Sequence, residues 1–275
     1  MTKLLNANFM RLKKSKIFYA ALVFMVGLAL LMIYSNYKAT NEGSEVELEG
    51  TLFAFASFMG IVIACFVSLF TGTEYSDGTI RNKIIVGHLR FEIYMADLIT
   101  SIIGSVVAAL IYVVIYVCGS IPITGWFTGE MKMILLSLGC ALILCAVFSS
   151  IFTFIAMLNQ NKAAIAVISL IVAMAILFAG SYFKILLSEP EYYEGAFMTE
   201  QGVLENKKVK NSRYLPPGTQ RDIYEFLDEF LPGGQQLKLM EGEVEEPYKY
   251  MGYSSIITVV VTGLGIMLFR KKDLK

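Results

Sequence analysis

Six apolar stretches constrain the fold more than any other feature of this 275-residue chain. A helix needs about 20 apolar residues to cross a bilayer, and each stretch is close to that length. Hydrophobic residues are 56% of the chain and charged residues only 17%, which is too apolar for a soluble domain. The predicted fold class is therefore an all-α integral membrane protein of the lipid bilayer with six spans. These are Ile17–Ser35, Leu52–Phe70, Leu98–Ile121, Met133–Leu158, Ala163–Phe183 and Tyr253–Phe269.

Basic residues predict the orientation, because Lys and Arg in short flanks stay on the cytoplasmic side. Lys13, Lys14 and Lys16 precede the first span, and Arg270 and Lys271 follow the last. Both termini are thus expected in the cytoplasm. The predicted organisation has three parts: 1–183 with five spans, an extracytoplasmic insert at 184–250, and 251–275 with the sixth span and a basic tail.

The insert at 184–250 is predicted to contain an amphipathic helix that Thr219 caps and that runs to about Leu231. Pro232-Gly233-Gly234 is expected to end it. This helix fits the outer membrane interface, the mouth of a pathway, or packing on its own loop. Residues such as Ser212 and Gln235 are expected to be reachable from outside.

The N-terminus has an apolar face, with Leu5, Phe9 and Leu12 at helical spacing among basic residues. An amphipathic helix on the cytoplasmic leaflet fits this pattern, and a plain basic flank is the alternative.

The spans lack visible chemistry, because no ionisable residue lies in the middle of any of them and the one histidine, His88, lies outside. Ser149, Ser150 and Thr153 have no accompanying base. The four cysteines lie in apolar stretches, which offers no metal spacing. We expect no catalytic residue, no metal site and no cofactor in this chain. A Gly-x-x-x-x-Gly-Lys-Ser/Thr loop for nucleotides is also missing, and the zero net charge argues against nucleic acid as a partner.

The loop 72–94, between the second and third spans, indicates a docking role. Asp77-Gly78 is a turn signal, and Thr79 is expected to cap the short helix that follows. This helix carries apolar and cationic side chains that suit a groove on a soluble partner: Ile80, Arg81, Lys83, Ile84 and Ile85.

The same loop resembles that of ABC-2-type permeases, the membrane subunits of ATP-driven exporters. The matching features are Glu74, Gly78-Thr79, the apolar helix 80–86, Gly87-His88 and Arg90. The run Glu-Tyr-x-x-Gly-Thr-Ile-Arg-Asn-Lys is particularly similar to a bacterial branch of lantibiotic-immunity and amphipathic-peptide exporters.

The resemblance implies an N-terminal elbow helix and a coupling helix that sits in a cleft of an ABC ATP-binding subunit. Two copies of that subunit, carrying ATP and Mg, would act on a pair of permeases, identical or not, in a bacterial plasma membrane. Glu74 would pair with the elbow, while Ile80 and Ile84 fill the partner's groove. The expected coupling residues are Glu74, Tyr75, Gly78, Thr79, Ile80, Arg81, Asn82, Ile84, His88 and Arg90.

The second span also carries two predicted faces. A small-residue stripe of the kind that lets helices approach closely is formed by Ala56, Gly60, Ala64 and Ser68. An aromatic and methionine face, which fits either lipid contact or a path for an amphipathic peptide, is formed by Phe55, Phe58, Met59 and Phe66.

Two other function classes fit the same chain. One is a membrane sensor or scaffold that binds a cytosolic partner through the loop. The other is an ATP-independent secondary transporter, which the charge-free spans disfavour because ion coupling needs a polar site at mid-membrane.

Overall fold

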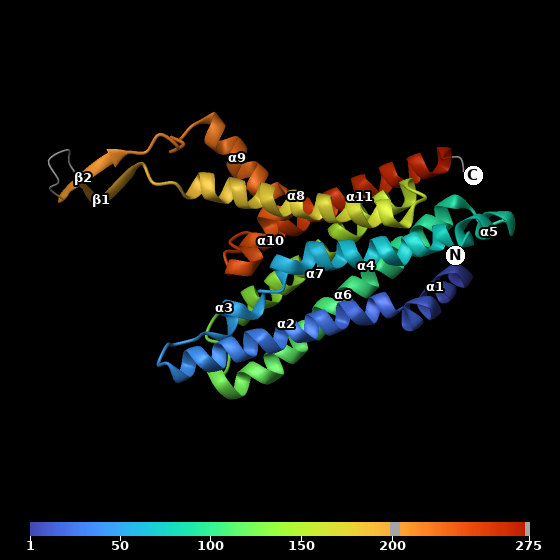
Figure 1. Ribbon diagram of the computed structural model, residues 1–275, viewed down its shortest axis with the longest axis horizontal. Coiled ribbons are helices and arrows are strands. Elements are labelled where there is room, and N and C mark those ends of the chain that lie inside the picture. The colour runs from blue at the N-terminus through green and yellow to red at the C-terminus, as the bar shows by residue number, and fades with distance from the viewer. Residues whose placement is uncertain (199–203, 273–275) are drawn as a thin grey trace.

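The computed structural model describes residues 1–198 and 204–272, and it forms an elongated helical bundle with a β-hairpin beyond one end (Figure 1). The helices are α1 (Thr2–Lys14), α2 (Lys16–Asn41), α3 (Leu48–Leu52), α4 (Ala56–Ser76), α5 (Thr79–Ile85), α6 (Arg90–Thr124), α7 (Met131–Leu158), α8 (Lys162–Ser188), α9 (Thr219–Phe230), α10 (Pro232–Glu241) and α11 (Pro247–Lys271). The strands are β1 (Tyr192–Met198) and β2 (Leu204–Lys210).

Within the described residues, six segments are long and apolar enough to cross a membrane. They are α2, α3 with α4, α6, α7, α8 and α11, and they coincide with the six predicted spans. The chain is therefore an all-α integral membrane protein in its membrane-spanning part. Figure 1 shows α1, α5 and the last turns of α11 at one end of the bundle, called here the α5 end, and the strands at the other, the hairpin end.

The second span is broken. Helix α3 ends at Leu52, and α4 begins at Ala56 after a turn closed by short-range bonds such as Ala56 N–H to Phe53 O at 2.8 Å. The Tyr116 hydroxyl of α6 donates to Leu48 O at 2.8 Å and accepts from Asn36 of α2 at 2.9 Å. These buried bonds attach α3 to the neighbouring spans.

The hairpin is the element that the all-α prediction omitted. Strands β1 and β2 pair antiparallel, with Tyr192 opposite Lys210. The apolar spacing of this insert predicts only a helix, whereas a two-stranded ribbon has a period of two residues and needs a partner strand that lies apart in the sequence.

The insert also returns into the bundle, which corrects two expectations. Helix α9 has Gly218 at its N-cap, with no side-chain cap from Thr219. It ends at Phe230, directly before the Pro232-Gly233-Gly234 run that was expected to end it, and Pro232 then starts α10, because proline fits the first turn of a helix.

Helix α10 packs among α8, α7 and α4. A Cβ on Gly233 would lie 2.0 Å from Ile176 O, halfway along α8. Only a glycine allows this approach. Gln235 is consequently 4% exposed, so the expectation that it is open to solvent is wrong, while Ser212 is exposed.

Candidate coupling site

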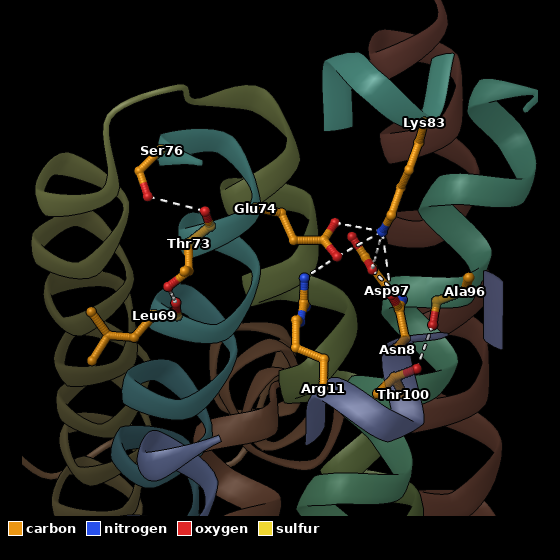
Figure 2. Close-up of polar contacts among 10 residues, drawn as sticks. All are labelled: Asn8, Arg11, Leu69, Thr73, Glu74, Ser76, Lys83, Ala96, Asp97 and Thr100. Atoms are coloured by element: carbon orange, nitrogen blue, oxygen red, sulfur yellow. Dashed lines mark hydrogen bonds and ion pairs between the residues drawn. The ribbon is translucent and has the colours of Figure 1, made fainter. Parts of the chain in front are cut away.

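A buried ion network surrounds Glu74 at the C-terminal end of α4 (Figure 2). Lys83 of α5 donates to both carboxylate oxygens, at 2.6 and 2.8 Å. Arg11 of α1 forms a second ion pair with the same carboxylate, and its guanidinium lies 3.8 Å from the centre of the Phe70 ring. The pairing of Glu74 with a basic residue of the N-terminal helix, expected from the sequence, is present.

Asp97 of α6 completes the network, and it is fully buried. The Lys83 ammonium lies 3.9 Å from its Oδ1. Asn8 of α1 bridges Asp97 and Lys83. Its side-chain NH₂ group donates to Asp97, and its side-chain oxygen accepts from the Lys83 ammonium at 3.2 Å. Figure 2 shows these side chains converging from α1, α4, α5 and α6.

The charges of the network balance. Glu74 and Asp97 carry two negative charges, and Arg11 and Lys83 carry two positive charges. Burying an ion is costly unless it is paired and hydrogen-bonded. Burial lowers the pKa of the Lys83 ammonium from its ordinary value, and the charge of Asp97 opposes this shift. The arrangement therefore depends on all four elements being in place at once.

Two glycines position α5. Gly78 has φ +66° at the N-cap and Gly87 has φ +99° after the helix. Residues that carry a side chain rarely adopt this left-handed backbone conformation. Thr79 is the first helical residue and makes no cap bond, so the expected capping role is wrong. The turn that Asp77-Gly78 predicted is present.

Some apolar residues of α5 pack inside the chain and others are exposed. Ile80 is 1% exposed and packs with Leu4, Ile93 and Phe269 of this same chain, and Ile84 packs against that cluster. The expectation that these two residues fill a partner's groove is wrong for Ile80, because its side chain anchors α5 to the bundle.

Three apolar positions near the end of α5 do face outward. Ile85, Val86 and Leu89 are 72, 77 and 66% exposed, and we call them the α5 patch. They lie between the end of α5 and the start of α6, where the chain reverses direction at the tip of the α5 end (Figure 1). Such an exposed apolar patch marks an interaction surface.

Tyr75 and Arg90 hold the end of α11. The Tyr75 hydroxyl donates to Met157 O at 2.7 Å and lies 3.4 Å from the Lys272 ammonium. Arg90 donates to Phe269 O at 2.9 Å and Arg270 O at 3.1 Å, which satisfies carbonyls that a helix end leaves unpaired. Their contacts are therefore within the chain.

The remaining polar residues of the loop lie on its surface. Arg81 lines a pocket of about 230 Å³ together with Glu74 and Tyr75, and Asn82 is exposed. His88 Nδ1 lies 3.9 Å from a Glu92 carboxylate oxygen. Arg81 is exposed and makes no ion pair within the part of the chain that the structure describes.

A scan of protein-family models matches residues 4–180 to the model described as ABC-2 family transporter protein. The chain belongs to the ABC-2 transporter family. The match contains the whole ion network and stops before the hairpin. A search of curated proteins found no match.

This ABC-2 family member is therefore a multi-pass membrane protein and the permease, or transport subunit, of an ABC transporter. Permeases of this family work with an ABC ATP-binding subunit. Glu74, Lys83 and the α5 patch lie in the segment that the resemblance marked as the coupling loop, whereas Asn8, Arg11 and Asp97 lie outside it.

The small-residue stripe of the permease is buried along its length. Ala56, Gly60, Ala64 and Ser68 all lie inside the bundle. A Cβ on Gly60 would lie 3.1 Å from the Phe148 ring of α7. The stripe therefore lies at contacts between α4 and its neighbours in one chain.

The aromatic face of the second span differs from its prediction. Phe55, Met59 and Phe66 are buried within the chain, and of this set only Phe58 is exposed. The three buried side chains cannot line a surface between two copies in this conformation. They pack inward because α4 is surrounded by α2, α6, α7 and α8.

Sequence reasoning missed Asn8 and Asp97 as site residues and treated Lys83 only as a surface cation. The sequence offered no signal for Asp97, because an ionisable residue directly before an apolar span is ordinary in a cytoplasmic flank. Helix α6 begins at Arg90, eight residues before the predicted span, so this carboxylate lies inside a helix and faces the bundle.

Proposed function

We propose that this chain is the permease subunit of an ATP-driven exporter in a bacterial plasma membrane. Two ATP-binding subunits, each with ATP and Mg, act on a pair of permeases through their α5 helices. The α5 end is the cytoplasmic end, consistent with its basic residues Lys13, Lys14, Lys16 and Lys271. The substrate is an amphipathic peptide, in line with the exporter branch that the loop resembles.

The observation that carries this proposal is the buried network around Glu74. Lys83 links α5 to the carboxylates of α4 and α6, and Arg11 and Asn8 link α1 to the same carboxylates. Helix α5 cannot move independently of α1, α4 and α6, because separating a buried ion from its partner costs about 3–5 kcal/mol. The helix therefore moves together with the ends of the spans that it contacts.

The α5 patch supplies the surface on which the ATP-binding subunit acts. Its three aliphatic side chains enter an apolar groove, and Arg81 beside them pairs with an acidic residue of that subunit. Closure of the two ATP-binding subunits then moves the α5 helices and switches the spans between two packings.

The test places the same charge at two positions of the α5 end. Val86→Asp puts a carboxylate in the middle of the patch, where burial without a partner is costly. Asn6→Asp puts one on a polar, exposed position of α1 at the same end of the bundle. Tagged permease is purified from its native cells, and the copurified ATP-binding subunit is measured by mass spectrometry and ATP hydrolysis.

We expect Val86→Asp to lose the ATP-binding subunit and its ATP hydrolysis, and Asn6→Asp to retain both. Equal membrane insertion of the two variants is verified by blotting. Copurification that survives Val86→Asp contradicts docking through the patch. Copurification of a cytosolic protein without ATPase activity would instead favour a sensor or scaffold.

A further inference from the structure

A cavity of about 300 Å³ lies at the hairpin end, away from the coupling site. Its walls are α3, the connection between α6 and α7, the first turns of α7 and the end of α10. Helices α3 and α10 lie close together there (Figure 1). These are the short helix of the broken second span and the helix that returns into the bundle.

Four glutamates line the cavity, and two of them are already engaged. Glu49 accepts hydrogen bonds from the Thr128 hydroxyl at 2.6 Å and from the Gly129 N–H. Glu241 forms an ion pair with Lys184 of α8. These contacts fasten α3 and α10 to their neighbours, so each of these two carboxylates already has a partner within the chain.

The other two, Glu47 and Glu130, have no hydrogen bond or ion pair from their carboxylates within residues 1–198 and 204–272. They occupy the N-caps of α3 and α7 without capping them. The N-terminus of a long helix such as α7 carries about half a positive charge. That is too little to neutralise two carboxylates, so the cavity keeps negative charge.

Ser137 is an independent observation at the same cavity. It lies nearly two turns into α7, is 8% exposed and lines the cavity. Among the described residues its hydroxyl makes no hydrogen bond. The residue is enclosed but its hydroxyl oxygen is not sealed off by protein, so its donor and acceptor positions are available to a polar ligand in the cavity.

The apolar part of the wall defines the ligand further. Phe53, Met133, Ile134 and Val244 line the cavity beside the carboxylates. No group of three or more His, Cys, Asp or Glu in the described chain is arranged to hold a metal ion. Charge and walls together suit an organic cation with an apolar body, since metal ions require several converging ligands.

We infer that this cavity binds the ammonium or guanidinium group of an amphipathic organic cation, with Glu47 and Glu130 pairing with the charge and the apolar wall holding the adjoining body. The identity of this ligand rests on the proposed function: the site receives the cationic part of the exported substrate on the extracytoplasmic side. Its occupant contacts α3 and α10 together.

The single tryptophan of the chain makes the site measurable. Trp126 lies in the connection between α6 and α7 that forms one wall. Permease without its ATP-binding subunit is placed in lipid nanodiscs and titrated with phenethylammonium. The matched probes are 2-phenylethanol, which is neutral, and phenylacetate, which is anionic. Tryptophan fluorescence and calorimetry both report binding.

We expect saturable binding of phenethylammonium and none of the other two probes. Glu47→Gln with Glu130→Gln should weaken binding at least about tenfold, or about 1.4 kcal/mol. The control pair Glu42→Gln with Glu45→Gln changes nearby acidic residues, between α2 and α3, that do not line the cavity. It should bind like the parent.

The inference is overturned if 2-phenylethanol binds as well as phenethylammonium, or if the Glu47/Glu130 variant binds phenethylammonium as well as the parent does. It is also overturned if neither measurement shows saturable binding. These outcomes are separate from a failure of the exporter proposal, because the permease is measured alone. Loss of copurified ATPase in the test of the α5 patch leaves the cation site unaffected.

Discussion

Lys83 is the residue on which the position of α5 depends most. Its ammonium contacts Glu74, Asn8 and Asp97, which come from three other helices. It is also the one cation of the network that α5 itself supplies. Removing its charge leaves two buried carboxylates with Arg11 alone.

We predict that Lys83→Met lowers the thermal stability of the purified permease, by on the order of 3 kcal/mol for an ion left uncompensated. The measurement is thermal unfolding in detergent. Lys132→Met, at an exposed position of α7, is the matched control and should leave the melting temperature unchanged.

A double variant separates loss of charge pairing from loss of packing. Glu74→Gln with Lys83→Met removes one charge of each sign, so its effect should be smaller than the sum of the two single effects. Additive effects, or a Lys83→Met variant that melts like the parent, would show that the network does not hold α5.

At the scale of elements, α4 is the helix that connects the two ends of the permease. It carries Glu74 at one end, and near the other the Gln236 amide of α10 donates to Ser57 O at 2.8 Å. Between them the stripe of small residues brings α7 close enough for the Phe148 ring to face Gly60. Contacts along α4 therefore connect the residues at its two ends.

We predict that Gly60→Leu destabilises the bundle by about 1–3 kcal/mol, the usual cost of overpacking. Gly27→Leu on α2 is the matched control, because a Cβ there meets nothing within 4 Å. Thermal unfolding and size-exclusion chromatography in detergent compare the two variants. A Gly60→Leu protein that melts and assembles like the control would place this face against lipid.

For the whole molecule, the return of the insert into the bundle changes the expected topology. Ser212 lies on the exposed side of the insert. Gln235, in contrast, donates to Glu229 O at 2.9 Å and accepts from the Ser254 hydroxyl at 2.6 Å inside the bundle. Residues 184–250 are thus one part external ribbon and one part packed helix.

We predict that Ser212→Cys reacts with an impermeant thiol reagent in intact cells and that Gln235→Cys does not. The background carries Cys118→Ser, because this cysteine is exposed. Labelling of both variants after denaturation controls for reactivity. Labelling of Ser212→Cys only after lysis would place the hairpin end in the cytoplasm, and rapid labelling of Gln235→Cys would contradict the buried position of α10.

Much of the architecture could be predicted because it depends on local patterns. The length of each apolar run predicts a span, and Asp77-Gly78 and Gly87-His88 delimit α5 in the sequence as they do in the folded chain. The Glu-x-x-x-Gly-Thr pattern indicates the family because its residues are close together in one loop. The hairpin was missed because two strands of seven residues each carry a much weaker signal than an apolar run long enough to span a membrane.

The sequence by itself determined that this chain has six spans, a turn-bounded loop helix between the second and third, and the family to which it belongs. Only the tertiary structure decided that Asn8 meets Asp97, 89 residues away, that Ile80 faces inward while Val86 faces outward, and that α10 reaches the middle of α8. The physical reason is that hydrophobicity and turn preference are properties of neighbouring residues. Pairing of buried charges and burial of one helix face depend on which helices become neighbours in space.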